Sequence, residues 1–528
     1  MAKLTADLAR SKALETALID DFGETTWDSL DRRVNRLVNG LRAVGLTAGD
    51  TIAVVAGNSR EWFEIAMACS HGGWTYVPAN WHWVADELAY LFQDAGAKVV
   101  ICDHRFASVV ASALSDERAD SVLAVIGIEP QNYAPQPAFA GEPRFQAYEA
   151  LLSAAAEDEP DNQQLGGPMF YTSGTTGRPK GVRSAWAGAA APGPEVLQAI
   201  ASGMSAFLPS SGRTLLCGPF YHSAQWAFSF LPFVAGASVV MRHRFDAAES
   251  LELIDRFAVT NIHLVPTQMK RLLDVPAERR AQFKGESLHI VWHGAAPCPP
   301  SVKQEMIEWW GPKINEYYGS TEGSVISMIS SSEWLTKGGS VGKPSPAVEV
   351  IVVDDNGERI TDGRDGTLYF RNLSGADFRY HNDDEKTEAA HLTPGVFTTG
   401  DVGHLDDEGY LWLTDRKIDM IISGGVNIYP AEIEGVLASH SSVADVAVIG
   451  VPDDEFGENV KAVVQLADGV PPSPGLEAEL LAHCHDKLAR YKAPKSFDFI
   501  DLIPRSAAGK IIKGPLRQPY WQGRGRSI

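Results

Sequence analysis

One segment combines glycines, hydroxyl side chains and a lysine at a spacing that suits the binding of phosphate. It reads Tyr171-Thr-Ser-Gly-Thr-Thr-Gly-Arg-Pro-Lys180-Gly181. Gly174 and Gly177 allow the backbone to turn its N–H groups inward, while the hydroxyls add donors and Lys180 adds a positive charge. The segment is not a Walker A loop, because Arg178-Pro179 separates the second glycine from the lysine. A polar linker is the alternative interpretation, but the appended Pro-Lys-Gly favours a loop that binds phosphate oxygens.

A serine in a second glycine-rich segment resembles a hydrolase nucleophile by its neighbours alone. Gly338-Gly-Ser340-Val-Gly342 matches the pattern G-x-S-x-G, which requires a strand before the serine and a helix after it. Lys343-Pro344-Ser-Pro346 follows directly, and prolines at these positions prevent a helix. We therefore expect Ser340 to have a structural role.

The composition excludes several other classes of protein. The chain has 528 residues, of which 45% are hydrophobic and 21% charged, as in folded proteins with more than one core. Its net charge of −21 disfavours a broad surface for nucleic acid or anionic lipid. The five cysteines are widely spaced without a C-x-x-C pair, which argues against a disulfide framework or a structural zinc site. The N-terminus shows no signal peptide, and the longest apolar run, Phe228–Met241, is too short to span a bilayer. We expect a cytoplasmic protein with no integral membrane segment.

The end of the chain has the opposite charge. Residues His485 to Ile528 include ten Lys or Arg and three Asp, a local excess of +7. This excess suggests an anionic small ligand, and a solvated basic tail is the alternative.

Helical and strand patterns alternate through the first half of the chain. Apolar residues at helical spacing predict a helix over Leu30–Gly45, and a buried strand over Asp50–Ala56 follows it. The same alternation predicts helices over Glu61–Gly72 and Ala85–Ala95, and strands over Trp74–Pro78, Lys98–Cys102, Thr214–Gly218, Ser238–Met241, Asn261–Val265 and His289–Trp292. Such alternation predicts mainly parallel sheets covered by helices.

The second half of the chain has a different pattern. Strands over Val348–Val353 and Thr367–Arg371 are expected to join through Asp355-Asn356-Gly357, and Asp406–Gly409 predicts a second hairpin. This middle piece should be antiparallel. After a boundary near Asp415-Arg416-Lys417, the pattern predicts helices over Pro430–Ser439 and Gly475–Leu488 and strands over Val443–Val451, Lys461–Leu466 and Ser496–Ile500.

With the loop at 171–181, further blocks make the sequence resemble the ANL superfamily of adenylate-forming enzymes, which includes acyl-CoA synthetases, adenylation domains and luciferases. These blocks are Pro219-Phe-Tyr-His222, Asn315-Glu-Tyr-Tyr-Gly-Ser-Thr-Glu322, Thr398-Thr-Gly-Asp401 with Asp415-Arg416, Gly424-Gly425-Val-Asn427 through Glu434, and Gly509-Lys510. They occur in the family's order over nearly the whole chain.

The resemblance implies an α/β fold with two domains. A large N-terminal domain, residues 1–416, would hold two helix-covered, mainly parallel sheets and a small antiparallel subdomain, and would bind ATP and the acyl group. A small, mobile α+β C-terminal domain, residues 417–528, would carry the catalytic lysine.

The resemblance also assigns the nucleotide site. Lys510 would bridge the attacking carboxylate and the α-phosphate as charge builds on phosphorus, a role suited to a fixed cation. Glu322 would hold Mg²⁺, and Asp401 would accept hydrogen bonds from the ribose hydroxyls. The ATP or AMP site would comprise Thr172, Ser173, Gly174, Thr175, Thr176, Gly177, Lys180, Gly294, Ala295, Ala296, Pro297, Tyr318, Gly319, Thr321, Asp401, Arg416 and Lys510. Thr172, Glu322, His222 and Lys510 would be the catalytic group.

The acyl and acceptor sites follow from the same resemblance. His222 would abut the acyl carboxylate, and orientation or gating is favoured over acid–base catalysis. Trp226 matches a tryptophan that gates the acyl tunnel of long-chain fatty acyl-CoA synthetases, and core packing is the equal alternative. The acyl site would comprise Tyr221, His222, Trp226, Gly294, Gly319, Ser324 and Val325, with Ser223 and Gln225 as further lining residues. CoA would pass Ser423, Gly424 and Gly425. No Lys or Arg is placed to bind a second carboxylate, so a hydrophobic monoacid (fatty, aryl or steroid-like) is expected.

The implied reaction is the ATP-dependent formation of acyl-AMP, followed by transfer of the acyl group to CoA. An amine or a carrier-protein thiol is the alternative acceptor, and a silent nucleotide-binding regulator is a distant one. A homodimer is the family's habit. One position departs from the family: the usual hinge residue two beyond Arg416 is Ile418, so either Asp419 takes the polar role or the hinge is apolar.

Overall fold

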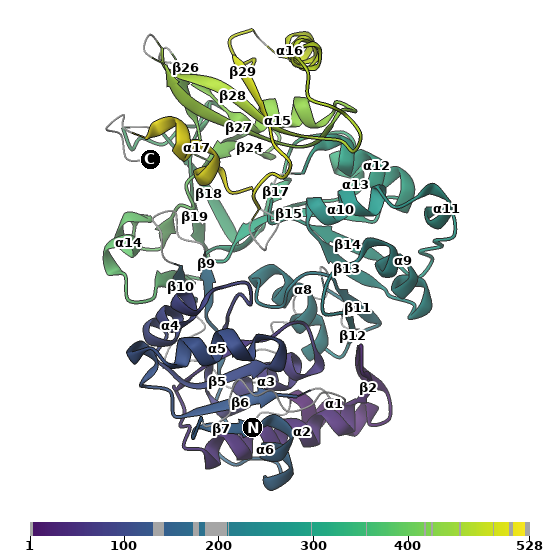
Figure 1. Ribbon diagram of the computed structural model, residues 1–528, viewed down its shortest axis with the longest axis vertical. Coiled ribbons are helices and arrows are strands. Elements are labelled where there is room, and N and C mark those ends of the chain that lie inside the picture. The colour runs from purple at the N-terminus through teal and green to yellow at the C-terminus, as the bar shows by residue number, and fades with distance from the viewer. Residues whose placement is uncertain are drawn as a thin grey trace. The chain divides into compact units, whose positions relative to one another are not determined.

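The computed structural model describes residues 4–129, 142–172, 179–184, 208–209, 211–296, 298–354, 356–416, 419–423, 426–453, 456–488, 490–505 and 511–522 (Figure 1). The chain divides into two compact units. The first comprises Met1–Leu264, Val275–Val291 and Ala376–Glu388, and the second comprises Val265–Asp274, Trp292–Gly375 and Ala389–Ile528. Each unit is described in turn.

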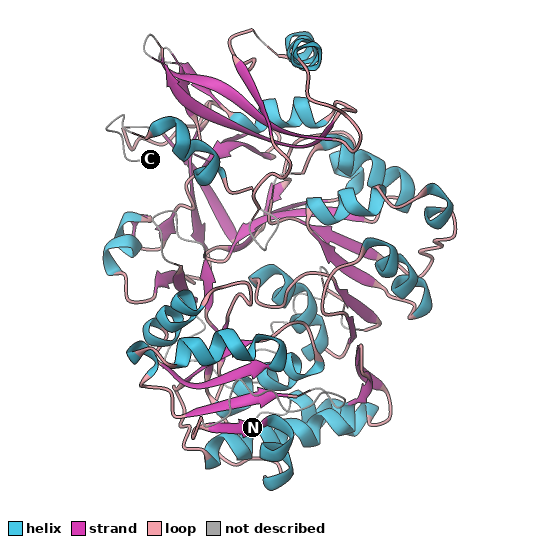
Figure 2. Ribbon diagram, in the orientation of Figure 1, coloured by secondary structure: helices cyan, strands magenta, loops and turns pink. Residues whose placement is uncertain are grey.

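The first unit contains a six-stranded parallel sheet in the order β7-β6-β5-β3-β4-β8. Its strands are β3 (Thr51–Val55), β4 (Thr75–Pro78), β5 (Ala97–Asp103), β6 (Ala124–Ile128), β7 (Phe145–Ala147) and β8 (Gly167–Pro168). The helices in this part of the first unit are α1 (Leu4–Lys12), α2 (Trp27–Ala43), α3 (Arg60–Gly72), α4 (Ala85–Asp94), α5 (Ala107–Leu114) and α6 (Tyr148–Ala154). Figure 2 shows helices above and below this sheet, and α4 and α5 bury one of its faces. Strands covered on both faces read as continuous apolar runs, which is why β3 and β5 were predictable.

Two further sheets belong to this unit. In one, β13 (Asn261–Leu264), β11 (Arg213–Leu216), β12 (Ser238–Met241) and β1 (Thr16–Asp20) run parallel, and β2 (Gly23–Thr26) is antiparallel at the edge. The other is antiparallel and joins β9 (Phe170–Thr172), β10 (Lys180–Ser184) and β20 (Phe378–Tyr380). The remaining helices here are α8 (Ser223–Val234), α9 (Ala247–Arg256), α11 (Ala277–Arg280) and α14 (Asp384–Ala389). The predicted parallel, helix-covered sheets are confirmed.

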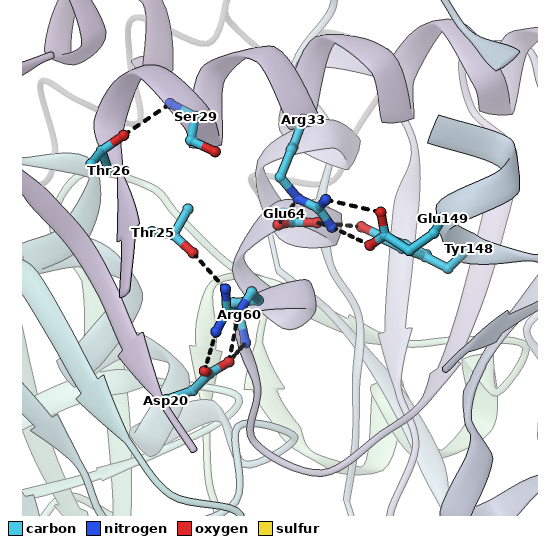
Figure 3. A network of polar contacts seen from close by, with 9 residues as sticks. All are labelled: Asp20, Thr25, Thr26, Ser29, Arg33, Arg60, Glu64, Tyr148 and Glu149. Atoms are coloured by element: carbon cyan, nitrogen blue, oxygen red, sulfur yellow. Dashed lines mark hydrogen bonds and ion pairs between the residues drawn. The ribbon is translucent and has the colours of Figure 1, made fainter. Parts of the chain in front are cut away.

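Three helices of the first unit are held together by a buried carboxylate (Figure 3). Glu64 of α3 is fully buried and accepts from the guanidinium of Arg33 on α2 at 2.6 Å and from the hydroxyl of Tyr148 on α6 at 2.8 Å. The same guanidinium donates to Glu149 of α6 at 2.7 Å. Burial of an unpaired carboxylate is costly, so these partners fix the helices against one another.

The second unit begins with helices and an antiparallel ladder. Helices α10 (Pro266–Leu273), α12 (Pro300–Trp310) and α13 (Ser331–Trp334) accompany β15 (Ile314–Ser320), β16 (Ser324–Ile329) and β17 (Lys343–Pro344), which pair antiparallel in that order. Of strand β14 (Ile290–His293), the last two residues, Trp292 and His293, belong to this unit. Ser340 is buried, donates to the Leu411 carbonyl at 2.8 Å and accepts from the Gly342 amide, so its predicted structural role is confirmed.

A six-stranded antiparallel sheet follows, as predicted for the middle of the chain. It contains β18 (Val348–Val353), β19 (Gly366–Asn372), β21 (His391–Thr393), β22 (Val396–Phe397), β23 (Asp401–Leu405) and β24 (Leu411–Arg416). The predicted second hairpin joins β23 to β24. The first prediction is confirmed in its strands, because β18 and β19 pair antiparallel, but residues 354–365 form a longer connection than a tight hairpin turn. The turn at Gly357, with φ of 83°, closes only a bridge between Val353 and Arg359. The Asn-Gly signal thus marked a local turn within the longer connection between the two strands that it was expected to join.

The last part of the chain forms a small α/β domain around one sheet. Its strands are β25 (Ile421–Ser423), β26 (Val426–Ile428), β27 (Val443–Asp453), β28 (Gly457–Leu466) and β29 (Ser496–Phe499), and its helices are α15 (Pro430–Ala438), α16 (Pro474–Lys487) and α17 (Lys513–Trp521). Each helix and strand predicted after residue 430 is present. In the described part of the chain, no helix is both long and apolar enough to cross a membrane.

Candidate active site

The ends of the predicted phosphate-binding loop meet on one rung of a β-ladder. Strands β9 and β10 are antiparallel, and Thr172 lies opposite Lys180. Residues 173–178 of the loop lie outside the described part of the chain. The ladder brings together a hydroxyl and an ammonium group that are eight positions apart in the sequence.

Lys180 has a partner that the sequence did not reveal. Its ammonium group lies 2.7 Å from the Asp383 carboxylate, just beyond β20, and both side chains are about three-quarters buried. The hydrogen bond between them raises the pKa of Lys180 and lowers the pKa of Asp383. On the preceding rung, Tyr171 donates to Asp94 at 2.6 Å. The lysine is therefore held in its charged form at the start of β10, the central strand of this small sheet.

The segment predicted to flank adenine has an unusual backbone. Ala295 has φ of 66°, a left-handed conformation that is costly for alanine and that clusters at functional sites. A Cβ on Gly294 would lie 2.6 Å from the ring of Tyr317, so only glycine allows this close approach to β15. Ala296 is partly buried, and Pro297 lies outside the described residues.

Two residues that were predicted to bind the nucleotide contact each other in the second unit. Tyr318, on β15, donates its hydroxyl hydrogen bond to Oδ2 of Asp401, at the start of β23. Thr399 donates to the same oxygen at 2.7 Å, and Asp401 is buried. Sequence reasoning missed Thr399, although it belongs to the Thr-Thr-Gly-Asp block. The backbone of Arg416 pairs with that of Asp401, while its side chain lies outside the described part.

A tight hairpin turn presents Thr321 and Glu322. Gly319 pairs with Val325 and Ser320 with Ser324 on β16, so the two predicted residues occupy the turn between these strands. A Cβ on Gly319 would lie 2.0 Å from the Ser324 carbonyl oxygen, and Ser324 itself has φ of 57°. No cluster of three or more His, Cys, Asp or Glu able to hold a metal ion occurs among the described residues.

A buried ion pair joins α12 to β15, the strand that carries Tyr318. Lys303 of α12 is completely buried and lies 2.6 Å from Glu316 of β15, which is also buried. His293, the residue before Gly294, lies 3.7 Å from the same carboxylate. Burial lowers the pKa of Lys303 and raises the pKa of Glu316, so each charge depends on the other. Nothing in the sequence indicated that Lys303 and Glu316 would form this pair.

Three of the predicted acyl-site residues, Tyr221, His222 and Trp226, lie at the start of α8 in the first unit, whereas Gly294, Gly319, Ser324 and Val325 belong to the second unit. His222 precedes the helix, and its ring is 4.5 Å from that of Tyr221. Trp226 donates its indole N–H to the buried hydroxyl of Tyr76 at 2.6 Å and stacks on Phe230. The Trp226 ring is therefore fixed on two sides. Tyr76 was missed because nothing in its own strand distinguishes it.

Gln225 was expected to line the acyl site, but its side chain makes contacts within the protein. It is buried, accepts from the Gly218 amide at 3.1 Å and lies 2.8 Å from His263. These contacts fix the start of α8 on the neighbouring strands.

In the C-terminal domain, Ser423 ends β25. Gly424, Gly425, Ile418 and Lys510 lie outside the described residues. Asp419 accepts from Arg517 of α17 at 2.8 Å, so the polar residue beside the expected hinge is engaged in an ion pair.

The family of the chain follows from comparison with known proteins. The AMP-binding enzyme family matches residues 6–376, and the C-terminal domain of AMP-binding enzymes matches residues 432–510. The chain belongs to the AMP-binding enzyme family. The predicted superfamily, and with it the prediction of an AMP-forming ligase, is confirmed.

Individual members of the AMP-binding enzymes are similar over almost the whole chain. An indoleacetate–CoA ligase from Aromatoleum aromaticum is 34% identical, over 96% of this chain and 95% of its own. A fatty acid–[acyl-carrier-protein] ligase from Streptomyces coeruleorubidus is 30% identical, over 100% and 98%. The o-succinylbenzoate CoA synthetase of Bacillus subtilis, solved with its acyl-adenylate intermediate, matches with a TM-score of 0.80 and 28% identity, covering 98% of both chains.

Proposed function

We propose that this AMP-binding enzyme is a CoA ligase for a compact aromatic carboxylic acid. One observation carries the proposal: Tyr318 forms one hydrogen-bonded group with Thr399 and Asp401, which lie far from it in the sequence, in a chain whose family binds AMP. An ionised carboxylate held in this way is suited to accept hydrogen bonds from ribose hydroxyls.

The reaction would proceed in two steps. An oxygen of the substrate carboxylate attacks the α-phosphorus of ATP, the bond to the bridging oxygen breaks, and pyrophosphate leaves. Lys510 would stabilise the charge that builds on the phosphoryl oxygens, while the 172–180 loop would hold the other phosphates. The CoA sulfur then attacks the acyl carbon, the bond to the AMP oxygen breaks, and the thiol proton is released.

The residues present fit Mg²⁺. Glu322 offers a single partly buried carboxylate, and Mg²⁺ is commonly held by one or two carboxylates together with substrate phosphates. When bound, the ion would supply positive charge to the phosphates. The chain itself would position Glu322 through the tight β15–β16 turn, where the Gly323 amide donates to the Ser320 hydroxyl at 2.9 Å.

The size of the acid is inferred from Trp226. Its ring is fixed by the hydrogen bond to Tyr76 and by stacking on Phe230, so it would resist the displacement that a long acyl chain requires. The similarity to an indoleacetate–CoA ligase favours the same class of acid.

The acceptor has one competing candidate. The similarity to a fatty acid–[acyl-carrier-protein] ligase favours a carrier thiol, whereas the basic tail of this chain suits the phosphates of CoA. We also propose that the N-terminal domain ends at residue 416 and the C-terminal domain begins at residue 417. The protein would form a homodimer and would be located in the cytoplasm.

The experiment measures pyrophosphate release across a panel of aryl, fatty and steroid-like acids, with and without CoA. We expect release with aryl acids, faster turnover with CoA, and an acyl-CoA product by mass spectrometry. Lys510→Ala should abolish release, while Lys284→Ala, an exposed lysine outside the site, should leave it intact. Release unaffected by CoA would indicate a carrier thiol or an amine, and absence of release with any acid would reject the proposal.

A further inference from the structure

Both ends of the segment that carries Lys510 are anchored to the C-terminal domain. The backbones of Arg505 and Ile511 form an antiparallel bridge, and the Ile512 amide donates to the Pro504 carbonyl at 2.8 Å. Lys510 lies outside the described residues and directly precedes Ile511 in the sequence. Whatever holds Arg505 and Ile511 therefore limits where the neighbouring lysine can go.

The incoming end is held by a two-pronged ion pair. Arg505 donates from Nε to Oδ2 of Asp445 at 2.8 Å and from Nη2 to Oδ1 at 2.7 Å. About a quarter of each side chain is exposed, so the pair is largely shielded from water. Parallel hydrogen bonds of this kind fix orientation as well as distance. Asp445 belongs to β27, at one edge of the domain's sheet, and is paired there with Gln465 of β28.

The outgoing end is held independently. Lys513, the first residue of α17, lies 2.9 Å from Glu434 of α15, and both side chains are mostly buried. Glu434 also accepts from the Val448 amide at 2.7 Å, which ties this pair to β27 as well. Ile511 packs with Ile503 against the same strand. Two ion pairs and an apolar contact thus attach both flanks to one rigid sheet.

We propose that Asp445 and Arg505 are positioning residues for Lys510 in the adenylation half-reaction. Neither is assigned to contact ATP, the acid or CoA; they would act through the Arg505–Ile511 bridge. The inference rests on the proposed function, in which Lys510 stabilises charge during attack on the α-phosphate; we assign Lys510 no part in thioester formation. Misplacement of a catalytic group by about 1 Å can cost on the order of 100-fold in rate.

The two half-reactions provide the test, and both are measured on the full chain. Adenylation is followed as acid-dependent exchange of labelled pyrophosphate into ATP, and thioester formation is followed from preformed acyl-AMP and CoA. Asp445→Asn should slow exchange by about 100-fold and leave thioester formation close to wild type. A merely structural role would not separate the two rates.

A second variant keeps the proposal falsifiable if Asp445→Asn folds poorly. Arg505→Lys retains the charge but cannot make the two-pronged contact, so it should also slow exchange selectively. Because both residues act through one contact, the double variant Asp445→Asn/Arg505→Lys should be no slower than the worse single variant.

The matched control is Glu432→Gln, which breaks the 2.6 Å ion pair between Glu432 and Lys492 in the same domain. Its ratio of exchange to thioester formation should equal that of the wild type. The positioning role is overturned if Asp445→Asn and Arg505→Lys slow both half-reactions equally, or neither. Absence of exchange in the wild type would instead overturn the proposed function, and this inference with it.

Discussion

Replacement of Lys303 by methionine tests whether the buried ion pair of the second unit needs both of its charges. Methionine keeps much of the lysine volume but removes the ammonium group that lies 2.6 Å from Glu316. Lys303 is completely buried and Glu316 nearly so, and the lysine also lies 4.8 Å from the ring of Trp334. The variant therefore leaves a buried carboxylate without its ammonium partner, a change that costs about 3–5 kcal/mol. For a unit of this size, that corresponds to a fall in Tm on the order of 10 °C.

The destabilisation should depend on pH, with a sign that can be worked out. Without Lys303, burial alone acts on Glu316 and holds its folded pKa above the unfolded value. A raised folded pKa means that the stability contribution is present below the unfolded pKa and is lost as pH rises through the folded one. Lys303→Met should therefore be closer to wild type at pH 5 than at pH 8.

Thermal unfolding at stepped pH measures this effect, and a double variant provides the control. Lys303→Met/Glu316→Gln removes both charges and should recover most of the lost stability, since replacement of a buried pair by neutral groups is often nearly neutral. A double variant as unstable as the single variant would refute the reasoning. So would a single variant with wild-type stability at pH 8.

Three further predictions concern the acid, the nucleotide and acid stability. Trp226→Ala removes the ring that Tyr76 fixes, so longer acids should gain kcat/KM relative to compact aromatic acids in the pyrophosphate assay; an unchanged preference would show that this ring does not limit the acid. Asp401→Asn should raise the KM for ATP about tenfold or more, because hydrogen bonds to a charged acceptor contribute about 1.5–3 kcal/mol. ATP titration at saturating acid measures this, and a rise confined to the KM of the acid would contradict it. Burial lowers the pKa of His263 from 6.5 to about 3. The contribution of the neutral His263 to stability is therefore present above pH 6.5 and is lost as the pH falls from 6.5 towards 3. His263→Asn should flatten the pH dependence of denaturant unfolding there, and an unchanged profile would point to other groups.

Local patterns predicted most of the fold. The helices over Leu30–Gly45 and Pro430–Ser439 appear as α2 and α15 with ends shifted by a few residues, because apolar spacing is a local property. The Asn-Gly turn was the exception. Its glycine does adopt positive φ, but the strands it was expected to join are connected by a longer segment.

Motifs predicted the chemistry but not the partners of its residues. The Thr-Thr-Gly-Asp block identified Asp401, and the structure added Tyr318 and Thr399 as donors to one of its oxygens. Lys180 was found by its loop, whereas its partner Asp383 lies about two hundred residues away and belongs to no motif.

The sequence by itself determined the family, the order of the helices and strands, and the residue types available for phosphate, ribose and carboxylate. These depend on spacing along the chain, which is readable without coordinates. Only the tertiary structure decided which charges are paired: Lys303 with Glu316, and Arg505 with Asp445. Such contacts join residues whose separation in sequence carries no signal, because the folding of the sheets, and not the local chain, brings them within hydrogen-bond distance.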